Sequence, residues 1–178
     1  MKRILFIVLF AIVSLNAFSQ DVIKFLGIPI EGNKKEMISK LCEKGYEYDS
    51  ESDLLSGEFN GIDVFISVQT VNNRVWRIAI VDENQNSDET NIKIRFNKLF
   101  DQLSNNSKYE LADGRKLEDS EDISYEMVVH KKRYDASFTF KDKSIHGLVW
   151  YMIAEQYGRY GILMFYENLD NAANGDDL

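Results

Sequence analysis

Few residues in this chain could carry chemistry. His130 and His146 are the only histidines, and Cys42 is the only cysteine. A metal site built on the histidines would need both side chains on one sheet face plus a carboxylate such as Asp135 or Asp142, and the spacing does not require this. We therefore predict surface histidines and no metal site. Cys42 falls within the apolar stripe of an expected helix, which predicts a buried small apolar side chain in place of a nucleophile.

Three acidic segments could hold a cation, but each departs from a calcium loop. In the segment 82–86 oxygen-bearing side chains alternate, yet Ser87 stands where the loop needs glycine and Lys93 where it needs the closing glutamate. The runs 118–122 and 170–178 also lack a full set of ligands. Solvated acidic loops are the simpler interpretation, so we assign no cofactor and leave calcium binding open.

Motifs of known enzymes are absent from the sequence. It contains no G-x-S-x-G elbow, no phosphate-binding glycine loop, no H-E-x-x-H and no C-x-x-C. A catalytic carboxylate pair stays open, because 29 acidic residues allow many pairs and the sequence does not indicate which two share a cleft. The sequence therefore favours a non-catalytic protein, with a small carboxylate-dependent hydrolase as the least favoured alternative.

The N-terminus has the pattern of a signal peptide. Lys2 and Arg3 precede an apolar stretch, residues 4–15, and small residues follow at the positions read by a signal peptidase. We predict a signal peptide over residues 1–19, and an exported mature chain, periplasmic or extracellular, with no membrane span. Loss of Lys2 and Arg3 changes the net charge from -8 to -10, which argues against nucleic-acid binding.

The periodicity of apolar residues predicts two amphipathic helices. The first covers residues 34–44, with Asn33 as N-cap and Gly45 after its end. The second begins after Ser87 or Asp88 and ends near residue 105. About seven strands are expected, over residues 54–59, 62–71, 74–81, 123–130, 134–140, 148–155 and 160–167.

Tight turns at Asn60-Gly61, Asn72-Asn73 and Tyr157-Gly158 indicate an antiparallel sheet. We predict a loop or a short irregular hairpin over residues 111–122. The predicted fold is α+β, with the two helices packed on this mainly antiparallel sheet. Residues 20–167 form a single domain, and residues 168–178 an acidic tail. Units 22–82 and 87–167 each contain a helix followed by strands. The segments 75–78 and 149–152 share a Val-Trp pair, so a tandem α-β-β-β repeat and coincidence both stay open.

The segment Phe25 to Asn33, followed by a helix ending at 44–46 and a strand carrying Gly57-Glu58-Phe59, resembles a group of uncharacterised exported proteins of Gram-negative gut bacteria. The order of elements also resembles the tandem helix-on-sheet units of beta-lactamase inhibitory protein and of small outer-membrane assembly lipoproteins. This chain lacks the disulfides and the lipidation cysteine of those proteins. The resemblance implies protein binding.

Aromatic residues in strands are the remaining feature of interest. Trp and Tyr on an uncovered sheet face bury much area while keeping a polar group, which suits an interaction surface. We expect Trp76, Trp150, Tyr151 and Tyr160 on the exposed face. The signal peptide, the pattern of helices followed by strands and the lack of catalytic motifs together predict an exported, non-catalytic binding or protein-interaction module of the cell envelope, whose partner is a protein or a small ligand. The alternative is a secreted enzyme inhibitor.

Overall fold

The computed structural model of the protein describes residues 21–85 and 88–172. The predicted signal peptide, Ser87 and the tail beyond residue 172 lie outside the described residues. In chain order the elements are β1 (Lys24–Phe25), β2 (Ile28–Pro29), α1 (Lys34–Glu43), β3 (Glu47–Asp49), β4 (Leu54–Phe59), β5 (Ile62–Val71), β6 (Arg74–Asp82), α2 (Glu89–Ser104), β7 (Tyr109–Asp113), α3 (Ile123–Val129), β8 (Asp135–Phe140), β9 (Gly147–Gln156) and β10 (Arg159–Asn168).

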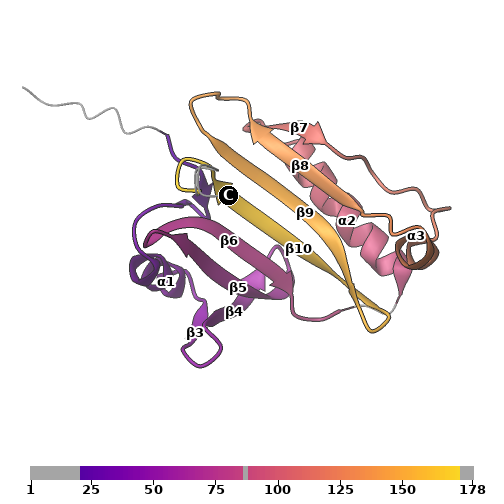
Figure 1. Ribbon diagram of the computed structural model, residues 1–178, viewed down its shortest axis with the longest axis horizontal. Helices are drawn as coiled ribbons and strands as arrows, with labels where there is room; N and C mark the ends of the chain where they lie inside the picture. The colour runs from indigo at the N-terminus through magenta and orange to yellow at the C-terminus, as the bar shows by residue number, and fades with distance from the viewer. Residues whose placement is uncertain (1–20, 86–87, 173–178) are drawn as a thin grey trace, which may run out of the picture.

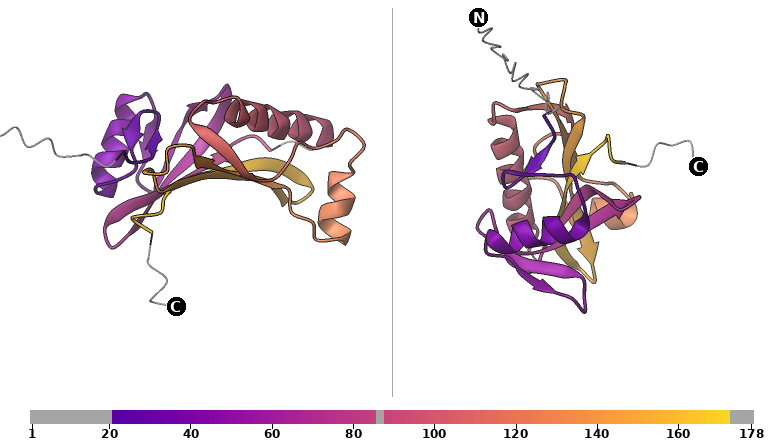
Figure 2. Two further views of the ribbon diagram at one scale, coloured as in Figure 1. Left: turned by 90° about the horizontal axis from the view of Figure 1, so that it is seen from above. Right: turned by 90° about the vertical axis from the view of Figure 1, so that its left-hand side faces the viewer.

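Eight strands form one antiparallel sheet in the order β3-β4-β5-β6-β10-β9-β8-β7, and β1 pairs with β2 separately. α1 packs on β3, β5 and β6, α2 packs on β7, β9 and β10, and both helices lie on the same side of the sheet (Figure 2). The α+β class and the antiparallel sheet are therefore confirmed. Two details were wrong, because the described residues contain three helices, and the main sheet has eight strands.

Two-residue turns join neighbouring strands where they were predicted. Asn60-Gly61, Asn72-Asn73 and Tyr157-Gly158 all have positive φ at both positions, from +49° to +78°. Asparagine and glycine tolerate this conformation, and it matches the twist of antiparallel strands. These turns set the register of β4 with β5, of β5 with β6 and of β9 with β10.

The two predicted helices are confirmed, and their apolar stripes face the sheet. The Asn33 side chain accepts a hydrogen bond from the Glu36 N–H at the start of α1, and Asp88 accepts one from the Thr90 N–H at the start of α2. Met37 and Leu41 are the buried residues of α1. Cys42 is exposed, so its predicted burial was wrong; it lies one position beyond the stripe that meets the sheet.

The segment predicted as a strand over residues 123–130 is the helix α3. Asp122 accepts a hydrogen bond from the Tyr125 N–H, and the carboxylate of Glu89 accepts from the N–H groups of Ile123 and Ser124 at 3.0 Å each. These bonds satisfy the free donors of the first helical turn. The apolar alternation was misleading because Ile123 is the buried residue of this segment. The edge strand that pairs with β8 is instead β7, whose last three residues fall in the segment 111–122 that was predicted to be a loop or an irregular hairpin.

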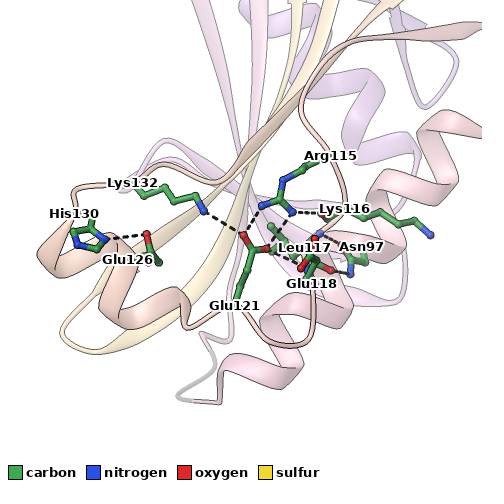
Figure 3. A network of polar contacts seen from close by, with 9 residues as sticks. All are labelled: Asn97, Arg115, Lys116, Leu117, Glu118, Glu121, Glu126, His130 and Lys132. Atoms are coloured by element: carbon green, nitrogen blue, oxygen red, sulfur yellow. Dashed lines mark hydrogen bonds and ion pairs between the residues drawn. The ribbon is translucent and has the colours of Figure 1, made fainter.

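The segment between β7 and α3 is held by a network centred on Glu121 (Figure 3). Its carboxylate accepts hydrogen bonds from Arg115, from Lys132 at 3.2 Å and from the Glu118 N–H at 3.0 Å. The Glu121 side chain is only 13% exposed. A solvated acidic run was predicted here, and for Glu121 that was wrong.

A second contact ties the same segment to α2 (Figure 3). The Asn97 amide donates to the Leu117 carbonyl at 2.9 Å and accepts from the Leu117 N–H at 2.8 Å. Leu117 is buried against the core. These contacts therefore fix the path of the segment from β7 to α3.

The pairing of β6 with β10 is called the central seam below. It matches Val81 with Leu163 at one end and Arg77 with Glu167 at the other. The seam joins strands β3 to β6 with strands β7 to β10 in one continuous sheet, and both strands lie at the middle of the molecule (Figure 1).

A buried ion pair lies at one end of the central seam. Asp82 accepts hydrogen bonds from Arg95 on α2 at 3.1 and 3.4 Å, and from the Ile162 N–H on β10 at 3.2 Å. Asp82 and Arg95 are 6% and 9% exposed. One carboxylate at the end of β6 therefore holds both α2 and β10.

Replacing Asp82 with alanine should lower the free energy of unfolding by about 3 kcal/mol, because Arg95 would keep a buried charge without its partner. The double variant Asp82→Ala/Arg95→Leu should recover part of this loss. Urea denaturation checks both, with the exposed neighbour Glu83→Ala as control. Equal effects of Asp82→Ala and Glu83→Ala would contradict the role of the pair.

The Glu121 network should make stability depend on pH. Partial burial alone would raise the pKa of Glu121, but hydrogen bonds from Arg115, the Glu118 N–H and Lys132 outweigh it and lower the pKa to about 2. Because this lies below the ordinary value of 4.5, the network stabilises the fold fully above pH 4.5 and loses its contribution as the pH falls toward 2.

Glu121→Gln should therefore lower the free energy of unfolding at pH 7 by about 1–2 kcal/mol, with a smaller effect at pH 2.5. Urea denaturation of the variant and the parent at both pH values measures the difference, and Glu118→Gln is the matched control. A Glu121→Gln variant as stable as the parent at pH 7 would refute this assignment.

Candidate functional site

The sheet face that α1 and α2 leave uncovered is called the open face. Figure 2 shows both helices on one side of the sheet, which bends away from them. Side chains alternate between the two faces along a strand, so the register identifies the open-face residues. In the middle of the four central strands they are Phe65, Ser67, Gln69, Arg77, Ala79, Val81, Leu163, Phe165, Glu167, Leu148, Trp150 and Met152.

These residues belong to three rows that cross the sheet. The first row is Glu47, Ser56, Phe65, Val81, Leu163, Met152 and Asp135. The second row is Ser67, Ala79, Phe165, Trp150, Ser137 and Asp113. The third row is Gln69, Arg77, Glu167, Leu148, Thr139 and Glu110. The open face thus has an apolar band over the central seam, with polar and acidic residues toward the edges.

A β-bulge adds a tryptophan to this band. The register shifts between the pairs Gln69↔Arg77 and Thr70↔Val75, so Trp76 is the extra residue on β6. The guanidinium carbon of Arg77 lies 3.9 Å from the centre of the Trp76 ring, whereas Val75 is fully buried. The bulge therefore places two consecutive side chains, Trp76 and Arg77, together at the open face.

The aromatic contacts continue across the central seam. The guanidinium carbon of Arg77 lies 5.2 Å from the centre of the Phe165 ring. Phe165 stacks on Trp150 with ring centres 4.2 Å apart and planes inclined by 22°. Cation–π and stacking contacts of this kind each contribute about 0.5–1.5 kcal/mol. Trp76, Arg77, Trp150, Phe165 and Glu167 are called the aromatic-arginine cluster below.

Glu167 fixes the orientation of this cluster. It is 5% exposed, and its carboxylate lies 2.6 Å from Arg77 Nη2 and accepts a hydrogen bond from Trp150 Nε1 at 2.8 Å. Gln69 accepts a further hydrogen bond from Arg77 at 3.5 Å. Such charge-assisted bonds are directional, so the guanidinium and the Trp150 indole are held in defined positions before any partner arrives.

The structure divides the four predicted site residues between the two faces. Trp76 and Trp150 belong to the aromatic-arginine cluster. Tyr151 and Tyr160 are 0% and 4% exposed in the helix-covered core, so the expectation that they lie on the exposed face was wrong. Tyr151 follows Trp150 directly and must point to the opposite face, where its hydroxyl donates to the Phe96 carbonyl of α2 at 3.1 Å.

Sequence reasoning missed Arg77, Phe165 and Glu167. The signal for Phe165 was present, because strand 160–166 has large apolar residues in both phases. Arg77 and Glu167 carried no such signal, since they are ninety residues apart in the chain. Only the pairing of β6 with β10 makes them neighbours.

The histidines occupy separate places at the surface. His130 lies 3.1 Å from Glu126, and His146 lies 2.8 Å from Asp170. All four side chains are at least 30% exposed. Within residues 21–85 and 88–172 no three histidine, cysteine or carboxylate side chains are grouped as metal ligands would be. Since the described histidines and carboxylates form no such group, the open face is the candidate site.

The two faces should respond differently to truncation. Tyr151→Ala should lower the free energy of unfolding by about 3–5 kcal/mol, because it leaves a cavity in the core and removes the hydrogen bond to the Phe96 carbonyl. Trp150→Ala should cost only about 1–2 kcal/mol, since its ring is partly exposed. Urea denaturation measures both. Equal losses would contradict the assignment of faces.

Comparison of the chain with protein-family models, with curated proteins and with solved structures finds no match. Within the described part of the chain, no helix has the length and apolar character needed to cross a membrane. The function is therefore argued from the geometry of the open face.

Proposed function

We propose that the mature chain is an exported, non-catalytic interaction module of the cell envelope that binds a protein partner through the open face. The observation that carries this proposal is the aromatic-arginine cluster, which places two tryptophans, a phenylalanine and a guanidinium on a sheet face that α1 and α2 do not cover. Tryptophan and arginine are among the residues most enriched where a few side chains dominate the binding energy of a protein interface.

The rigidity of the cluster supports binding. Ordering a rotamer-rich side chain at an interface costs about 0.5–1.5 kcal/mol. Arg77 and Trp150 have lost much of this freedom already, because Glu167 bonds to both. A partner that meets them therefore gains contact area at a smaller entropic cost.

The dimensions of the open face suit a protein better than a small molecule. Eight strands about 4.8 Å apart give a width of about 34 Å, and the ten-residue central strands are about 33 Å long. A stable protein–protein interface covers about 800 Å² on each partner. The open face can supply that area.

The secreted-inhibitor hypothesis uses the same surface, because inhibitors of enzymes are pre-organised proteins. It predicts that the partner is an enzyme whose activity falls on binding. The hydrolase hypothesis receives less support. Glu167, the carboxylate inside the cluster, is bonded to Arg77 and Trp150, and a general acid or base must instead exchange protons with a substrate.

The order of elements supports the tandem-unit hypothesis. α1 is followed by four strands, α2 is followed by four strands with α3 inserted, and the last strands of both units pair at the central seam. The shared Val-Trp pair gives no support, because Trp76 lies on the fourth strand after α1 and Trp150 on the third strand after α2.

Affinity capture tests the proposed function. The mature chain, residues 20–178, is immobilised and exposed to envelope extract of the native cell, and bound proteins are identified by mass spectrometry. Trp150→Ala/Phe165→Ala should reduce recovery of a specific partner at least tenfold, because it removes the centre of the apolar band.

The same extract gives the N-terminus of the native chain, which we expect to be Gln20.

The control is Ile94→Ala, which removes an apolar side chain that is 61% exposed on α2 and should leave recovery unchanged. Both variants must show the circular dichroism spectrum of the parent. A partner recovered equally well by the double variant binds elsewhere and refutes the proposed use of the open face.

A further inference from the structure

A cavity of about 340 Å³ on the helix-covered side of the sheet is called the seam cavity below. Tyr46 and Phe59 line it from the half that contains α1. Leu99 and Leu103 of α2 and Tyr109 of β7 line it from the other half. The cavity therefore lies between the two halves, and its volume is within the range of small-molecule sites, about 300–1,000 Å³.

The floor of the seam cavity belongs to the central seam. Met164 and Tyr166 of β10 line the cavity, and they alternate along the strand with Leu163 and Phe165 of the open face. Because neighbouring side chains of a strand point to opposite faces, the sheet separates the seam cavity from the open face. A molecule in the cavity would therefore not touch the aromatic-arginine cluster.

Two tyrosine hydroxyls that line the seam cavity are unpaired. Tyr109 and Tyr166 are each 8% exposed, and among the described residues no hydrogen bond reaches either hydroxyl. Neither oxygen is among the unpaired polar atoms that the described residues fully enclose, so both stay open to the cavity. Tyr46 shows the usual arrangement, since its hydroxyl donates to the Glu58 carbonyl at 2.9 Å. Buried polar groups are normally paired, so two unpaired hydroxyls in one cavity point to a ligand that bonds to them.

Both hydroxyls can donate a hydrogen bond at neutral pH. Burial raises the pKa of Tyr109 and of Tyr166 above the ordinary value of 10.0. A negative charge on Tyr109 would raise the pKa of Tyr166 further, so the two phenol groups lie near each other. Both groups therefore keep their protons and can donate to an acceptor oxygen placed between them.

The rest of the lining is apolar or uncharged, with one exception. Phe59, Leu99, Leu103 and Met164 supply apolar surface. Glu58, which is exposed, is the only charged residue among the described residues of the lining. Burying an ion without a counter-charge is costly. The lining therefore favours an uncharged, mainly apolar molecule, and its aromatic rings suit a flat one.

A polar pair at the edge of the seam cavity links the two halves. Asn60 in the turn between β4 and β5 and Gln102 of α2 both line the cavity, and they exchange hydrogen bonds of 2.5 and 3.0 Å. This pair holds the turn against α2, so the cavity is formed before any ligand enters.

We propose that the seam cavity binds a small, uncharged, mainly apolar molecule, and that Tyr109 and Tyr166 donate hydrogen bonds to a carbonyl oxygen at its buried end. This site goes beyond the proposed function and is independent of it, because the open face lies on the other side of the sheet. A molecule that lacks the carbonyl would leave both hydroxyls unpaired, so it should bind more weakly.

Two related probes test the proposal on the mature chain. Prodan is an uncharged naphthalene ketone that fluoresces at shorter wavelength in an apolar site, and its analogue carries a methylene group in place of the carbonyl. Fluorescence titration should show that the chain binds prodan with a shift of the emission to shorter wavelength. It should also bind prodan more tightly than the analogue, because the carbonyl adds hydrogen bonds.

Tyr109→Phe/Tyr166→Phe removes both hydroxyls and keeps the rings that line the cavity. In this variant the preference for prodan over the analogue should fall at least about fivefold, because the carbonyl loses both donors. The control Tyr125→Phe/Tyr160→Phe removes two hydroxyls of residues that do not line the seam cavity, and it should keep the preference. Each variant must retain the circular dichroism spectrum of the parent, and the single variants Tyr109→Phe and Tyr166→Phe give the same test if the double variant does not fold.

Trp150→Ala/Phe165→Ala separates the two sites and should leave prodan binding unchanged. No binding of prodan, equal effects of the two tyrosine double variants, or loss of prodan binding in Trp150→Ala/Phe165→Ala would each overturn the proposal. None of these results refutes the proposed function, which is tested by capture of a protein partner on the open face.

Discussion

The antiparallel pairing of β6 with β10 is the interaction on which the rest of the structure depends. Its five residue pairs are the only strand pairing, among the described residues, between the halves β3 to β6 and β7 to β10. Asp82 strengthens the pairing from the helix-covered face, where it accepts from the Ile162 N–H and from Arg95. Arg77 and Glu167 join the same two strands on the open face. Polar contacts therefore reinforce the pairing of β6 with β10 on both faces of the sheet.

The candidate site exists only because of this seam. Trp76 and Arg77 come from β6, Phe165 and Glu167 come from β10, and Trp150 comes from the adjoining strand β9. Two separate four-stranded sheets would each carry part of the cluster and would have no continuous apolar band. Burying the carboxylate of Glu167 is costly unless it is paired, and the guanidinium of Arg77 and the indole N–H of Trp150 provide that pairing. The polar centre of the site and the stability of the seam are thus coupled.

Local signals in the sequence predicted most of the elements, and long-range contacts decided the rest. Asn33, Asp88 and the turn at Asn60-Gly61 act on their immediate neighbours, so their effects could be predicted from the sequence. The helix α3 could not be predicted in this way, because two of its first N–H groups donate to Glu89, which lies thirty-four residues earlier in the chain. Trp150 and Tyr151 were grouped as candidates because both are aromatic, although neighbours in a strand point to opposite faces. Only packing against α2 shows that Tyr151 is the one that lies inside.

In-cell photo-crosslinking tests the central claim, that the open face binds a protein, most directly. A p-benzoylphenylalanine residue replaces Phe165 in the aromatic-arginine cluster, and in a second strain it replaces Ile94 on the exposed side of α2. The account predicts an irradiation-dependent crosslinked species of higher mass from position 165 and none from position 94. Crosslinking from position 94 but not from position 165 would contradict it.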